Sequence, residues 1–162
     1  MATVNSMTGR LKSERGAELI EFALIFPLLL LLIVGMVDFG FMFQRFEVLT
    51  NAAREGARIA VLPGYVQADV EARVQNYVTS GGVPSTAGNP TVGYLSCSIP
   101  AGAATPLSGK RISVTYSHSY LFLGPIAAMF GGNFSTVPIT AVAIMRDELA
   151  SGGGGGGPLP PC

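Results

Sequence analysis

The longest apolar run in the chain covers residues 22–37 and contains no charged side chain. Residues 17–38, which enclose this run, come close to the roughly 20 residues that an α-helix needs to cross a bilayer. The preceding residues 1–16 carry three basic side chains against a single acid. Basic residues on that flank predict one membrane pass, with residues 1–16 in the cytoplasm and the bulk of the chain outside.

The helical pattern continues beyond the membrane-length segment. We expect one helix over Ala17–Leu62, ended by the breaker pair Pro63-Gly64, after a short disordered start over residues 1–9. At 1.5 Å per residue this helix is roughly 70 Å long, more than twice the hydrocarbon thickness of a bilayer. Residues 39–62 should therefore project out of the membrane. Pro27 lacks a backbone donor and should kink or locally unwind the membrane half.

The projecting half of the helix is amphipathic. Its apolar residues form two adjoining stripes, Phe41, Val48, Ala52 and Ile59, and Phe46, Leu49, Ala53, Ala57 and Ala60. The polar side carries Arg45, Glu47, Arg54, Glu55 and Arg58. We interpret the part from Arg54 to Arg58, with Glu55, as a solvated face rather than a site. Small side chains, together with Gly56, would let another element approach this helix closely.

Shorter elements follow the long helix. Valines and Tyr77 recur at helical spacing over Val66–Val78, which predicts a second helix ended by Gly81-Gly82. Strand-like runs cover Val92–Ile99, Arg111–Leu121 and Val137–Arg146, with a short helix or turn over Gly124–Phe130. The middle run alternates, with Ile112, Val114, Tyr116, His118 and Tyr120 on one face and serines and Thr115 on the other.

These patterns predict an α+β fold. It has a long N-terminal helix with a transmembrane and an amphipathic half, a second short helix, and a small antiparallel sheet of about three strands covered by the helices. Residues 65–148 form the domain outside the membrane. Residues 149–162, six glycines followed by prolines and a cysteine, are expected to be a flexible tail with a stiffer tip.

The composition argues against several classes of function. Only 12% of residues are charged and the formal net charge is zero, which disfavours a nucleic-acid-binding protein. The single histidine, His118, has no second histidine or acidic cluster beside it, so we interpret it as a packed structural residue. No phosphate-binding loop, metal-ligand cluster or nucleophile elbow is present in the sequence. We therefore expect no enzyme activity, no cofactor, no metal and no small-molecule substrate.

The sequence leaves open the role of Asp38 and the pairing of the two cysteines. Asp38 could be a functional intramembrane acid, although a position at the outer membrane–water boundary fits it better. Cys97 and Cys162 are the only cysteines. Outside the cytoplasm they could pair with each other, while a cysteine at the end of a glycine tract could equally stay free or join another chain.

Glu21 is the least ordinary residue of the membrane segment, because ionisable groups inside a bilayer are costly. A cleaved secretory signal would need small residues after the apolar run, where Val37-Asp38-Phe39 is bulky. A plain signal anchor has a suitable length but leaves the acid unexplained.

The order Gly16, Ala17 and then Glu21-Phe22 resembles the prepilin cleavage motif of type IV pilin-like proteins. In that family a membrane-embedded prepilin peptidase cuts after the glycine, on the cytoplasmic side. The resemblance implies cleavage between Gly16 and Ala17, with Phe22 as part of the processing motif. Gly16 suits this role because a residue without a side chain leaves the scissile bond accessible.

A wider set of residues is similar to the TadE-like pseudopilins, minor components of the tight-adherence (Tad) pilus apparatus. The set comprises Arg15-Gly16-Ala17, Glu21-Phe22-Ala23-Leu24, Pro27 with its leucine run, Asp38-Phe39-Gly40, and residues 49–58. The resemblance implies a minor pilin or pseudopilin that takes part in Tad pilus assembly, adhesion and surface colonisation. It implies a prepilin peptidase, other Tad pilins and pseudopilins, and the inner-membrane assembly platform as partners. The expected location is the bacterial inner membrane, with a periplasmic domain and a place in an extracellular pilus.

Cleavage would create a new partner for Glu21. The freed ammonium of Ala17 and the Glu21 carboxylate are each costly in lipid and much less so as a pair. In pilin-like assemblies the pair can join neighbouring subunits, which gives both residues a role in subunit assembly. Two rival functions remain, a signal-anchored periplasmic binding or sensory module that is not cleaved at Gly16, and an enzyme with a site near His118.

Overall fold

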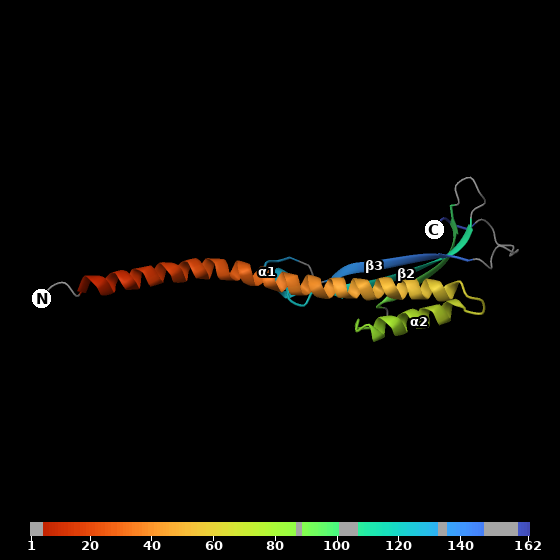
Figure 1. Cartoon of the computed structure of the whole chain (residues 1–162), viewed down its shortest axis with the longest axis horizontal. Coiled ribbons are helices and arrows are strands. Elements are labelled where there is room, and N and C mark those ends of the chain that lie inside the picture. The colour runs from red at the N-terminus through yellow and green to blue at the C-terminus, as the bar shows by residue number, and fades with distance from the viewer. Residues whose placement is uncertain (1–4, 87–88, 101–106, 133–135, 148–158) are drawn as a thin grey trace.

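The computed structural model describes residues 5–86, 89–100, 107–132, 136–147 and 159–162, with side chains from residue 16 onward. The elements follow in the order α1 (Asn5–Ala60), α2 (Gln67–Ser80), β1 (Thr91–Ile99), β2 (Leu107–Ser119), α3 (Leu123–Met129) and β3 (Thr136–Arg146). The α+β fold expected from the sequence is confirmed. The first half of α1 extends as a rod from a small folded part that contains every other element (Figure 1).

The long helix begins earlier than the sequence pattern predicted. It starts at Asn5 rather than Ala17 and includes 56 residues, so residues 5–9 are helical and not disordered. Residues 1–4 lie outside the described part of the chain. The helix forms here because Met7, Leu11, Lys12 and Glu14 all favour helical backbone and no proline precedes Pro27.

The three strands form an antiparallel meander in the order β1-β2-β3. Val92 of β1 lies opposite Val114 of β2, which lies opposite Ala141 of β3. The β1 and β3 bounds agree with the sequence prediction to within one residue. β2 begins earlier, at Leu107, because residues 107–110 pair with the end of β1 although Ser108, Gly109 and Lys110 show no apolar alternation.

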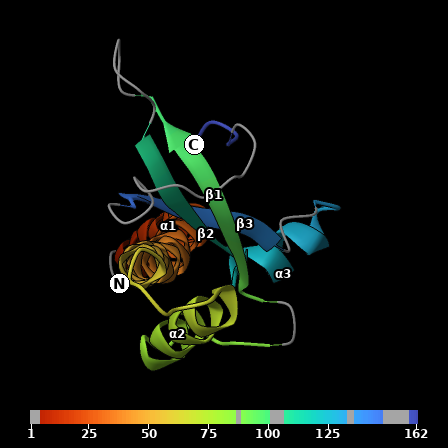
Figure 2. The ribbon, with the colours of Figure 1, turned by 90° about the vertical axis from the view of Figure 1, so that its right-hand side faces the viewer.

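The core lies between the inner face of the sheet and the outer half of α1, with α2 packed beside α1 (Figure 2). Side chains from four elements are buried in it, and they include Leu49, Ala52, Ala53, Ala57, Val70, Val74, Ile112, Val114, Tyr116 and Ala141. The predicted inward face of β2 is therefore confirmed. Phe41 and Phe46 from the predicted α1 stripes lie outside this core and are exposed.

Gly56 lies where α1 is closely packed against its neighbours in this core. A Cβ atom placed there would lie 2.5 Å from Val74 Cγ2 and 3.2 Å from Ile112 Cγ2. The small residues of α1 thus do admit neighbours, as the sequence predicted, and the neighbours are α2 and β2. Any larger residue at position 56 would push apart three elements that meet at one point.

Candidate processing and assembly segment

Gly16, Ala17, Glu21, Phe22 and Pro27 all lie in the protruding half of α1. Ala17 and Glu21 are four residues apart, which places them on the same side of the helix. Both side chains are exposed. Among the residues whose side chains are described, none forms a hydrogen bond or ion pair with Glu21. Within the described part of the chain, this carboxylate is therefore exposed and has no bonding partner.

Gly16 has no neighbour that would require a glycine. A Cβ placed there meets nothing within 4 Å, so packing within the described part of the chain does not restrict this position. Phe22 is also exposed and stacks only on Phe26 of the following turn, with ring centroids 5.3 Å apart. The residues of the cleavage motif are thus open to a partner from outside.

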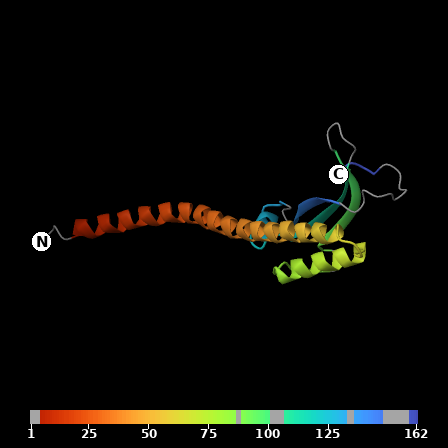
Figure 3. The same ribbon diagram turned by 45° about the vertical axis from the view of Figure 1, so that its right-hand side comes forward.

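The segment lies in a helix that is long and apolar enough to cross a membrane, and none of its most apolar 18-residue window is buried. α1 stays helical through Pro27, so the helix is not unwound there. Figure 3 shows a gentle bend in the protruding half. Leucines and phenylalanines cover this half on all sides, which is typical of a helix that is surrounded by lipid or by other helices.

Asp38 lies at the end of the membrane-length segment, and its carboxylate is used within the fold. Its side chain is only 1% exposed. Oδ1 accepts the backbone N–H of Leu121 at 3.1 Å, and Oδ2 accepts those of Phe122 and Leu123 at 3.0 and 2.7 Å. The carboxylate satisfies the free amides at the start of α3 and ties this element to α1.

A second polar contact lies two turns further along α1. Arg45 Nη1 donates a hydrogen bond to His118 Nδ1 at 2.6 Å, because a guanidinium group has no acceptor. The Arg45 guanidinium also lies over the Tyr116 ring, 5.6 Å from its centroid. Burial and the nearby Arg45 charge lower the pKa of His118 below its usual value, although Asp38 raises it. His118 is therefore a buried neutral side chain that links the sheet to α1.

Glu55 connects α1 to α2. It forms ion pairs with Arg58 of its own helix, at 2.9 Å, and with Arg73 of α2, at 3.1 Å. Hydrogen bonds from Arg58 and Arg73 lower the pKa of Glu55 to about 2 although burial opposes this shift. Arg54 and Arg58 are exposed, as expected, whereas Glu55 between them is half-buried and connects α1 to the second helix.

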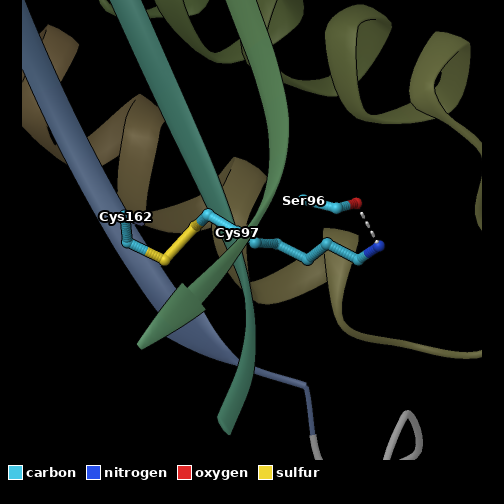
Figure 4. Close-up of a disulfide and its surroundings, with 4 residues drawn as sticks. Ser96, Cys97 and Cys162 are labelled. Carbon is cyan, nitrogen blue, oxygen red and sulfur yellow. Dashed lines mark hydrogen bonds between the residues drawn. A yellow bond between two sulfur atoms is a disulfide. The ribbon is translucent and has the colours of Figure 1, made fainter. Parts of the chain in front are cut away.

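The cysteines are joined to each other. A disulfide connects Cys97 of β1 to Cys162, with Cα atoms 4.9 Å apart (Figure 4). Two backbone hydrogen bonds accompany it, from the Ser98 N–H to the Pro160 carbonyl and from the Cys162 N–H to the Ser98 carbonyl. Residues 159–162 of the expected flexible tail therefore lie fixed against the edge of β1. Its glycine tract lies outside the described residues.

The helix that carries these residues also matches a known protein family. The family described as TadE: TadE-like protein matches residues 16–58. The chain carries a TadE-like segment. The match begins at Gly16 and ends within the last turn of α1, so it covers both halves of the helix and confirms the resemblance predicted from the sequence. No curated protein and no solved structure matches the chain.

Sequence reasoning located the TadE-like segment but not the contacts that hold the rest of the chain to it. Asp38 lies 83 residues before Leu121, and Arg45 lies 73 residues before His118. Neither pair shares a motif or a periodicity. The sequence offered two signals, an acid with no obvious role (Asp38) and a lone histidine on an inward strand face (His118). In the structure Asp38 of α1 accepts amides before and at the start of α3, and His118 of β2 accepts a hydrogen bond from Arg45 of α1.

Proposed function

We propose that this protein is a minor pilin or pseudopilin subunit of a Tad pilus, and that a prepilin peptidase cleaves it between Gly16 and Ala17. The observation that carries the proposal is the TadE-like segment itself, which begins at the scissile glycine and leaves Glu21 exposed on an unbroken helix. Gly16, Ala17 and Phe22 form the processing motif. The mature helix remains in the inner membrane, with the folded part in the periplasm.

Cleavage supplies the partner that Glu21 lacks. A free ammonium group on Ala17 and a carboxylate on Glu21 would each cost several kcal/mol in the low-dielectric membrane, and pairing offsets most of this cost. When the pair forms between neighbouring subunits, it fixes their relative register as chains enter the filament. The exposed leucines and phenylalanines of the same half then pack against other pilin helices and lipid.

The folded part supports the periplasmic location. Disulfides persist in oxidising compartments, which include the bacterial periplasm, and Cys97 is paired with Cys162. The partners in this proposal are the prepilin peptidase, other Tad pilins and pseudopilins, and the inner-membrane assembly platform, and the pili serve adhesion and surface colonisation. The proposal assigns the protein no catalysis, cofactor, metal or nucleic acid.

The assembly role is tested with two matched substitutions in the native host. Glu21→Ala should still be processed but should fail to support piliation, because the Ala17 ammonium then has no partner. Glu18→Ala removes the same charge one turn earlier, outside the motif pair, and should leave piliation unchanged. Pili are counted by electron microscopy and processing is followed by mass. Normal piliation with Glu21→Ala would refute the pairing.

A further inference from the structure

The segment Leu121–Phe130, which contains α3, is unusually apolar for an exposed element. None of the α3 residues is buried. Met129 and Phe130 are 84% and 85% exposed, and Leu121 and Phe122 are also exposed. The surrounding residues 112–145 contain no aspartate, glutamate, lysine or arginine. Exposed apolar side chains without any charge between them mark a contact surface.

This apolar segment lies at the end of the folded part that faces the protruding half of α1 (Figures 1 and 3). It and α1 enclose a groove of about 390 Å³ lined by apolar residues, which include Leu31, Phe39, Leu123, Ile126 and Phe130. Leu31 lies about 12 Å before Phe39 along the helix axis, at 1.5 Å per residue. The α3 segment therefore runs beside the last turns of the membrane-length half.

Three backbone N–H groups around the start of α3 have an acceptor within the chain, which suits an environment without water. An exposed helix start normally leaves its first N–H groups to solvent, and such groups are costly in lipid. Here the Asp38 carboxylate accepts the N–H of Leu123, the first residue of α3, and those of Leu121 and Phe122 just before it. At the other end, the Gly132 N–H donates to the Ala127 carbonyl at 2.8 Å.

We infer that Leu121–Phe130 is a membrane-surface element that inserts into the outer leaflet beside α1, with lipid acyl chains filling the groove. Lipid is the occupant because the apolar surface is continuous with the membrane-length half of α1, which lipid surrounds. Interfacial elements of this kind bury their apolar face about 5–10 Å deep, which agrees with the position beside residues 31–39. The inference rests on the proposal that α1 crosses the membrane.

The chain contains no tryptophan, so a single introduced tryptophan reports its own depth. The full-length protein is reconstituted at high lipid excess into phosphatidylcholine vesicles, and fluorescence quenching is measured with brominated phosphatidylcholine and with aqueous iodide. The test variants are Phe130→Trp and, in case the first fails to fold, Met129→Trp. Phe26→Trp in the membrane half and Tyr77→Trp on α2 serve as controls for lipid and for water.

We expect Phe130→Trp and Met129→Trp to emit at shorter wavelength than Tyr77→Trp and to lose most of their fluorescence to lipid brominated near the headgroup. Iodide should quench them several-fold less than Tyr77→Trp. Strong iodide quenching without bromolipid quenching would overturn the inference. Protection from both quenchers would also overturn it and would indicate a second protein chain over α3. If Phe26→Trp itself escapes bromolipid, the membrane-spanning proposal fails instead.

Discussion

The two halves of α1 are both apolar, but they differ in how far their apolar side chains are buried within the chain. In the outer half, small residues and Leu49 are buried against α2 and the sheet. In the membrane half, leucines and phenylalanines are exposed on every side. The difference is that the folded part covers the outer half and reaches only the last turns of the membrane half. A helix with two apolar halves can thus contribute one half to the fold and the other to subunit assembly. Among the described residues, most of the buried apolar side chains of α1 belong to the outer half.

Two of the acids of this helix, Glu21 within the membrane half and Asp38 at the junction of the two halves, show the same difference. Asp38 accepts three backbone amides from within the chain and is buried. Glu21 is exposed, and no described side chain bonds to it. Substitutions in the outer half should therefore change folding stability, whereas matched substitutions in the membrane half should not. All five tyrosines lie beyond residue 62, so their near-ultraviolet circular dichroism reports unfolding of the folded part alone.

The largest contrast is expected from leucine substitutions. Leu49→Ala should lower the free energy of unfolding by about 4 kcal/mol, because it leaves a cavity at a fully buried position. Leu24→Ala changes a side chain that is 75% exposed and should leave unfolding of the folded part unchanged. Thermal and denaturant unfolding in detergent micelles measure both. Equal losses for the two variants would mean that the halves are not independent.

The acids should give the next largest contrast. Asp38→Ala leaves three amides at the start of α3 without their acceptor and should cost about 3 kcal/mol. Asp38→Asn keeps one acceptor oxygen and should cost less. Glu21→Ala should unfold like the unaltered chain in the same assay. Wild-type stability in Asp38→Ala would show that the α3 contact contributes little.

Two glycines offer a matched pair in one helix. Gly56→Ala should destabilise the folded part by about 2 kcal/mol, because the added Cβ overlaps Val74 where α1, α2 and β2 meet. Gly35→Ala adds the same atom in the membrane half, where nothing lies within 4 Å. Its unfolding temperature should stay constant or rise slightly through helix propensity. The contrast would fail if both alanines were tolerated equally.

The smallest effect is expected at the Glu55 ion pairs. Glu55→Gln should cost about 1 kcal/mol at neutral pH, since exposed arginines are screened by solvent. The pKa of Glu55 is about 2 in the folded chain, below its ordinary 4.5, so this stabilisation is complete above the ordinary value and disappears as the pH falls through about 2. Unfolding is compared at several pH values. Glu47→Gln, an exposed control, should show no such pH dependence.

Much of the fold could be predicted because it follows from local periodicity. The helical spacing over Val66–Val78 and the alternation of β2 each identify a face. Burial confirms the face of β2 and the three valines Val70, Val74 and Val78 of α2, whereas Val66 and Tyr77 are exposed. What could not be predicted depends on contacts between distant residues. The amide acceptor role of Asp38 and the Arg45–His118 bond exist only once β2 lies against α1. The start of α1 at Asn5 could not be predicted from hydrophobic periodicity, because residues 5–16 are mostly polar and form helix through their intrinsic propensity.

The cleavage at Gly16 is the claim on which the other functional conclusions depend, and intact mass tests it most directly. The full-length chain is expressed with and without an active prepilin peptidase, and the membrane-bound product is measured by mass spectrometry. We predict a mature chain that begins at Ala17 only when the peptidase is present, and an uncut precursor for Gly16→Val. A product that retains residues 1–16 beside an active peptidase would contradict the account and favour an anchored binding or sensory module.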